Sequence, residues 1–273
     1  MSQRDDYQPG VPSWIDILQP DPEAAMAFYG ALFGWELAGS GPMGYFVARL
    51  HGRDVAGIGS PPAEGPAPPP AWTTYVYVES ADGVAEKARS AGGAVLIEAF
   101  DVLPAGRLAI LADPAGAVFG AWEPRERKGA QRVNEAGAWT MSHLETPDPD
   151  GAAAFYGAVF GWTTETFGAA EGAVTMFRLP GFVGGEPEQP VSREVIATMA
   201  AADGDESPRW SAGFWVDDVD AVAQSAERLG GRTVAPPLAS PVGKAAVLAD
   251  PSGVSFTVSS VPGQAAERSD ATA

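Results

Sequence analysis

Residues 20–35 read PDPEAAMAFYGALFGW, and residues 147–162 read PDPDGAAAFYGAVFGW. Twelve of these sixteen positions are identical, at an offset of 127 residues. A second pair, AILADPAGAVF at 109–119 and AVLADPSGVSF at 246–256, is identical at seven of eleven positions, at an offset of 137. Self-similarity at a fixed spacing indicates tandem copies of one unit. The ten extra residues of the second copy are expected within the stretch 185–208.

This duplication predicts how the 273 residues are divided. We expect a first domain over 11–123 and a second over 138–260, joined by a linker over 124–137. Residues 1–10 and 261–273 are expected to be flexible tails. A chain of this length can hold two domains of ordinary size.

Each copy contains the same short order of elements twice. Asp21 and Pro22 provide a helix cap followed by proline at the first helical position, and Gly34 is placed to end that helix. An extended run precedes the helix and three strand-like runs follow it, and the second half of the copy repeats this order. The sequence therefore predicts an α+β protein with four βαβββ modules.

Four such modules, together with the FYGALFGW and LADPAG blocks, resemble the vicinal oxygen chelate superfamily of glyoxalases, bleomycin-resistance proteins and dioxygenases. The resemblance covers roughly residues 11–123 and 138–260, and it is nearest to the two-domain actinobacterial type. It implies that the modules pair into two cup-shaped mixed-sheet domains, each with a ligand site inside the cup.

The resemblance also implies where the metal ligands of this family, usually His or Glu, would lie. Those positions hold Trp14, Gly57, Thr73 and Gly120 in the first copy and Met141, Gly184, Ser211 and Thr257 in the second. A divalent metal needs carboxylate, imidazole or thiolate ligands, and none of these eight residues supplies one. The sequence therefore predicts no metal and no other cofactor.

Alternation along the strands predicts which side chains line the cups. The inward set comprises Trp14, Asp16, Tyr75, Tyr77 and Trp122 in the first copy and Met141, His143, Glu145 and Trp215 in the second. Aromatic residues on a sheet face are often part of the core. In a cup without metal ligands, they also suit a flat apolar ligand.

Composition restricts the partners. The chain has 17 basic and 35 acidic residues, a formal net charge of −18, which opposes nucleic-acid binding and favours cationic ligands. It has no cysteine, no apolar run of membrane-spanning length and no signal-like start. We expect a cytoplasmic monomer, without a membrane partner, whose two domains correspond to the subunits of a dimer.

These observations favour a metal-independent binding protein of the bleomycin-resistance kind. Its ligand would be an aromatic metabolite or antibiotic of the anthracycline type, with or without an amine, bound for sequestration, self-resistance or biosynthesis. One alternative is a metal-free cyclase, isomerase or oxygenase (hydroxylase) that uses His143 with Glu145 or Asp16 for acid–base catalysis. A metal-dependent glyoxalase or dioxygenase is a further alternative, although His143 and Glu145 alone give only two ligands.

Overall fold

Two eight-stranded mixed sheets and four helices form the described part of this computed structural model, residues 3–40, 44–61, 70–168, 174–184, 194–202, 207–240 and 243–260. The first sheet has the order β2 (Glu36–Ser40), β3 (Phe46–Leu50), β4 (Arg53–Gly59), β1 (Pro12–Leu18), β5 (Trp72–Tyr77), β8 (Val118–Pro124), β7 (Gly106–Ala112) and β6 (Ala94–Val102). The second has the order β10 (Thr163–Phe167), β11 (Val174–Arg178), β12 (Val195–Ala201), β9 (Trp139–Thr146), β13 (Arg209–Trp215), β16 (Ser255–Ser260), β15 (Gly243–Ala249) and β14 (Arg232–Ser240). The helices are α1 (Pro22–Phe33), α2 (Ala81–Ser90), α3 (Pro149–Phe160) and α4 (Val219–Arg228). The predicted α+β fold of four paired βαβββ modules is confirmed.

The repeated Asp-Pro and Gly residues determine where α1 and α3 begin and end. The Asp21 carboxylate accepts a hydrogen bond from the backbone N–H of Ala24, and Gly34 adopts the left-handed conformation that ends α1. Asp148 and Gly161 do the same for α3. No helix within the described ranges is long and apolar enough to cross a membrane.

The two modules of each copy join at the centre of their sheet, where β1 runs antiparallel to β5 and β9 antiparallel to β13. In the first sheet Asp16 is level with Gly57 and Thr73. In the second sheet His143 is level with Thr198 and Ser211. Asp16 and His143 therefore occupy equivalent positions, on the face of each sheet turned away from the helices. We call this the inner face; the inner faces of the first and second sheets are cup 1 and cup 2.

The insertion overlaps the predicted stretch but precedes a strand that the sequence analysis did not place there. Strand β12 lies inside the stretch 185–208, which was expected to be a connector. The longer connection, residues 179–194 between β11 and β12, begins before the predicted stretch and ends within it, so the counterpart of Gly57 in the second copy is Thr198. Gly184, which we had aligned with Gly57, lies outside the strands. The sequence of β12, VIATMAA, resembles no run in the first copy. Aligning the copies from the repeated helix block therefore placed the insertion after this strand.

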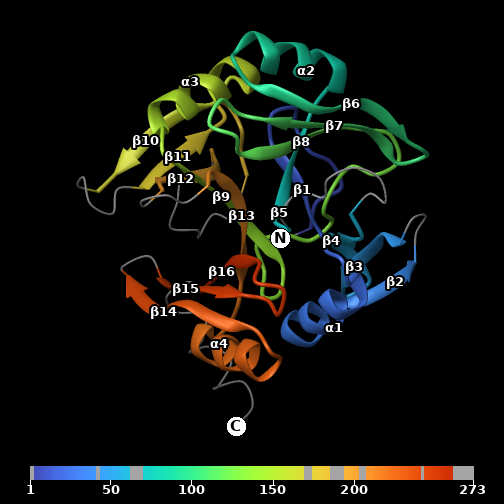
Figure 1. The fold of residues 1–273 in the computed structure, drawn as a ribbon, viewed down its shortest axis with the longest axis vertical. Coiled ribbons are helices and arrows are strands. Elements are labelled where there is room, and N and C mark those ends of the chain that lie inside the picture. Colours follow the sequence, from blue (N-terminus) through green and yellow to red (C-terminus); the bar gives the residue numbers. More distant parts are fainter. Residues whose placement is uncertain are drawn as a thin grey trace.

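The helix-covered cores are shared between the two copies. Figure 1 shows α2 beside α3 at one end of the molecule and α1 beside α4 at the other. At the α1 end, the ring of Phe33 lies 4.7 Å from that of Phe214, and Tyr29 lies 5.5 Å from Phe256. At the α3 end, Phe119 packs against the rings of α3. Each copy therefore completes the core of the other, as two subunits do in a symmetric dimer.

Hydrogen bonds between the repeated motifs connect the copies in the same reciprocal way. The Tyr29 hydroxyl donates to Asp250 at 3.0 Å, and the Tyr156 hydroxyl donates to Asp113 at 3.2 Å. Both aspartates also accept backbone N–H groups of their own turn through the other carboxylate oxygen. The Tyr of the FYG block and the Asp of the ADP block thus fix the pairing of the copies.

The linker and the N-terminal segment lie against the first sheet. Residues 3–10 were expected to belong to a flexible tail, but Gln3 forms a β-bridge with Arg132, and the Tyr7 hydroxyl donates to the carbonyl of Ala130 at 2.6 Å. The backbone N–H of Ala130, in the linker, donates a hydrogen bond to the carbonyl of Ser13 in β1. The C-terminal tail predicted over 261–273 lies outside the described residues.

Candidate functional site

A hydrogen-bonded cluster around Asp16 fills cup 1. The Asp16 carboxylate accepts hydrogen bonds of 3.0 Å from the hydroxyls of Tyr45 and Tyr75. The Tyr45 hydroxyl accepts one of 2.9 Å from the indole of Trp14. Only 5% of Asp16 is exposed. Burial raises its pKa to about 7, although the hydrogen bonds from Tyr75 and Tyr45 act in the opposite direction.

The two tyrosines occupy the space that metal ligands would need. A Cβ atom at Gly57 would lie 1.8 Å from the Tyr45 hydroxyl, and one at Gly120 would lie 2.0 Å from Cδ1 of Tyr75. Any side chain at these two positions would displace a tyrosine. Glycine stands there because the rings of Tyr45 and Tyr75 lie directly over the backbone.

The linker covers the remainder of this cluster. The guanidinium of Arg127 lies over the ring of Trp14, with its carbon 5.6 Å from the ring centroid, and forms an ion pair with Asp54. The indole of Trp122 donates a 2.8 Å hydrogen bond to the carbonyl of Arg127. Trp14, Tyr75 and Trp122 are all buried. Tyr77 lies at the end of β5, partly exposed, and its hydroxyl donates to Asp6.

Cup 2 has a more accessible inner face. Its central side chain, His143, lies over Gly213, where a Cβ atom would be 2.8 Å from Nε2 of the imidazole. Nδ1 of His143 is 2.5 Å from the hydroxyl of Thr198, and burial lowers the pKa of the imidazole to about 4. His143 is therefore neutral at pH 7, although part of its surface remains exposed on the inner face.

Met141 and Glu145 flank His143 on β9, and both are partly exposed. Glu145 forms an ion pair with Arg209, which is level with it on β13. Gly213 on β13 stands where cup 1 has Tyr75, and the neighbouring inward positions hold Ser211 and Thr257. Trp215 lies near the end of β13 and is buried.

In the part of the chain that the structure describes, neither cup contains the set of donor side chains that the metal implied by the sequence resemblance would need. Within the described ranges, no group of three or more His, Cys, Asp or Glu side chains is placed to hold an ion. Of the positions first considered, Trp14, Gly57, Thr73 and Gly120 lie on the central strands of the first sheet. Met141, Ser211 and Thr257 lie on those of the second. In cup 2 the nearest donors are one imidazole and one carboxylate already paired with Arg209.

Sequence reasoning missed several residues that shape the two cups: Tyr45, Arg127, Thr198 and Arg209. Tyr45 could have been found, because it alternates with Val47, which is level with Gly57. Thr198 was hidden by the misplaced insertion. Arg127 belongs to the linker, and nothing in the sequence indicates that the linker crosses the first cup.

Known proteins match both copies and the whole chain. The pattern of the Glyoxalase/Bleomycin resistance protein/Dioxygenase superfamily matches residues 12–120, and that of a Glyoxalase-like domain matches residues 140–259. "Putative glyoxylase CFP32" of Mycobacterium tuberculosis is 38% identical over 267 residues, which are 94% of this chain and 97% of that protein. The chain belongs to the glyoxalase/bleomycin resistance/dioxygenase superfamily.

Other known proteins are similar to this chain in sequence or in fold. The anthracycline biosynthesis proteins DauV of Streptomyces sp. (strain C5) and DnrV of Streptomyces peucetius are 31% and 30% identical, over 92% of this chain and 94% of each relative. Among solved structures, the Mn(II)-bound glyoxalase from Novosphingobium aromaticivorans has a TM-score of 0.65 at 16% identity, covering 93% of this chain and 82% of that one. At such low identity the likeness shows the fold alone.

Proposed function

We propose that this superfamily member is a metal-independent binding protein that takes an aromatic small molecule into cup 2. Its role would be sequestration, self-resistance or assistance to antibiotic biosynthesis. The relatives named for anthracycline biosynthesis support this class of ligand, because they align over nearly the whole chain.

The observation that carries the proposal is the difference between the two cups. In cup 1 the ring of Tyr75 covers Gly120, and Trp14 and Asp16 are buried. At the equivalent positions of cup 2, Met141 and His143 remain partly exposed. A flexible thioether and an imidazole face can both pack against a flat ring.

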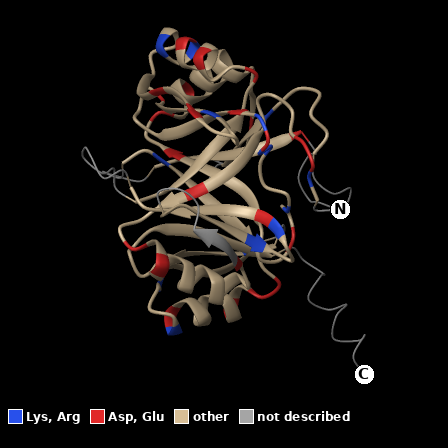
Figure 2. Ribbon diagram, turned by 90° about the vertical axis from the view of Figure 1, so that its right-hand side faces the viewer, with Lys and Arg blue, Asp and Glu red and all other residues tan. Residues whose placement is uncertain are grey.

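Polar groups around this face would orient the ligand. Neutral His143 can donate or accept a hydrogen bond, and the Glu145–Arg209 pair offers both charges at one edge. Figure 2 shows acidic residues spread over both ends of the molecule. The net charge of −18 would favour the approach of an amine-bearing ligand.

A metal-free enzyme is the second candidate, because His143 and Glu145 share this face. The lowered pKa of His143 argues against it, since an imidazole with a pKa of about 4 is a weak general base at neutral pH. Asp16, the other acid–base candidate, is enclosed in cup 1 by Tyr45 and Tyr75.

Calorimetric titration with an anthracycline such as daunorubicin tests the proposal. We expect a dissociation constant in the micromolar range, which corresponds to a binding free energy of about −8 kcal/mol. Met141→Trp, which places in cup 2 the residue that cup 1 has at that position, should weaken binding at least about tenfold by filling the face. Leu96→Trp, at an exposed position on β6, is the matched control and should leave binding unchanged.

Two results would overturn this proposal. One is binding no tighter than about millimolar across anthracyclines and other polycyclic aromatic compounds. The other is an unchanged affinity in a folded Met141→Trp variant. Conversion of the ligand by the purified protein, detected by mass spectrometry of the mixture, would favour the metal-free enzyme instead.

A further inference from the structure

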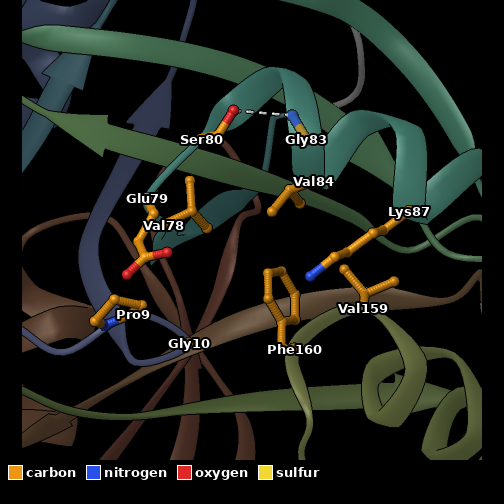
Figure 3. A pocket seen from close by; sticks show the side chains of 10 residues that line it. All are labelled: Pro9, Gly10, Val78, Glu79, Ser80, Gly83, Val84, Lys87, Val159 and Phe160. Carbon is orange, nitrogen blue, oxygen red and sulfur yellow. Dashed lines mark hydrogen bonds between the residues drawn. The ribbon is translucent and has the colours of Figure 1, made fainter.

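A pocket lies on the helix side of the first sheet, at the seam between the two copies. It has a volume of about 340 Å³ and is formed by the N-terminal segment, the start of α2 and the end of α3. Its apolar floor consists of Val78 and Val84 from the first copy and Val159 and Phe160 from the second (Figure 3). The three valines are buried, and Phe160 is partly exposed.

The pseudo-symmetry of the molecule explains why there is space here. At the other end, Phe33 is the counterpart of Phe160, and its ring packs 4.7 Å from that of Phe214. The counterpart of Phe214 on β5 is Val76, which is much smaller. Phe33 is consequently buried, whereas one side of Phe160 remains accessible. The two ends of the molecule therefore differ in how far these phenylalanines are covered.

Two charged side chains of opposite sign face each other across the apolar floor. Figure 3 shows Glu79 beside Pro9 on one side of the pocket, and Lys87 beside Phe160 and Val159 on the other. Within the described ranges, neither the Lys87 ammonium nor the Glu79 carboxylate has a hydrogen-bond or ion-pair partner in the protein. The backbone N–H of Gly83, by contrast, is already bonded to the Ser80 hydroxyl.

We propose that this pocket binds a small zwitterion whose ammonium and carboxylate stand at opposite ends of an apolar body, as in a dipeptide of apolar residues. The ligand carboxylate pairs with Lys87, its ammonium pairs with Glu79, and its side chains cover Val84 and Phe160. A zwitterion has no net charge, so the strongly acidic protein does not repel it as it would a simple anion. The proposal is independent of the ligand in cup 2.

The test is a titration of the full chain with leucyl-phenylalanine, followed by calorimetry and by NMR. We expect saturable binding with a dissociation constant of about 1 mM or below. Because both charged groups are at the surface, Lys87→Met and Glu79→Gln should each weaken binding about two- to fivefold, and the double variant about tenfold. Asp217→Asn, at the counterpart of Glu79 on the other side of the pseudo-dyad, is the matched control and should leave binding unchanged.

Two modified peptides separate the contributions of the charges. N-acetylation removes the ammonium and C-terminal amidation removes the carboxylate, and each should weaken binding to the wild type but have no further effect on the variant that lacks the partner group. Absence of saturable binding to about 10 mM overturns the proposal. So does equal affinity of the wild type and a folded Lys87→Met, Glu79→Gln double variant. The anthracycline titration of both proteins reports on cup 2 separately.

Discussion

Replacing Asp16 by Asn is expected to change how the stability of the protein depends on pH. Burial raises the Asp16 pKa from its ordinary value of 3.8 to about 7. Between these two values, the folded protein holds a proton on Asp16 that the unfolded chain has released. Stability that depends on this proton is present below about pH 4 and is lost as the pH rises towards 7.

The size of the effect follows from the difference between the two pKa values. About three pH units, at about 1.4 kcal/mol for each unit, give an upper limit of about 4 kcal/mol. The asparagine side chain of the Asp16→Asn variant would carry no such proton, and its amide can still bond to Tyr75 and Tyr45. The free energy of unfolding of the wild type, relative to Asp16→Asn, should therefore decrease by about 1 kcal/mol or more for each unit between pH 5 and pH 7.

Urea unfolding followed by tryptophan fluorescence, from about pH 5 to about pH 8, measures this difference. Tyr75→Phe provides a second readout. This substitution removes a hydrogen bond that lowers the Asp16 pKa, so the pKa should rise further. The decrease in the free energy of unfolding should then continue to higher pH than in the wild type. Asp21→Asn, at an exposed helix cap, is the control and should shift the whole profile without changing its slope. Parallel profiles for the wild type and Asp16→Asn would refute the account of a buried carboxyl that stays protonated.

Three further outcomes are expected. Gly57→Ala should lower the free energy of unfolding in urea by about 1–3 kcal/mol, because its Cβ would meet Tyr45, and adding Tyr45→Ala should recover part of the loss. Elemental analysis should find no stoichiometric divalent metal, and a chelator should change neither the melting temperature nor ligand binding, since the described residues offer no ligand cluster. Light scattering should give a mass near 28.2 kDa, because the two copies already bury their helix-side faces against each other; a stable mass near twice that value would contradict this.

The sequence predicted the four modules because their signals are local. A helix cap such as Asp21 and a terminating glycine such as Gly34 act within a single turn, and the duplication gave each signal twice. Alternation along the central strands gives the face on which each side chain lies, so Asp16 and His143 could be assigned to one face.

The filling of cup 1 depends on contacts between distant segments, which alternation does not specify. Tyr45 reaches Asp16 from β3, and Arg127 reaches Trp14 from the linker. Glycine at 57 and 120 was interpreted only as the loss of a ligand. The structure shows that glycine is also what allows a tyrosine ring to lie against the strand.

The two cups could diverge because the pairing of the copies does not depend on them. The pairing depends on two hydrogen bonds on the helix side, from Tyr29 to Asp250 and from Tyr156 to Asp113. Each of these bonds needs one residue from each copy. A substitution there would disturb the core that both copies share. On the inner faces, a substitution in one cup leaves these hydrogen bonds between the copies in place, and in a single chain it is not repeated in the other cup. Fusion therefore allows cup 1 to become a buried, hydrogen-bonded core while cup 2 keeps an accessible face, which a dimer of identical subunits could not do.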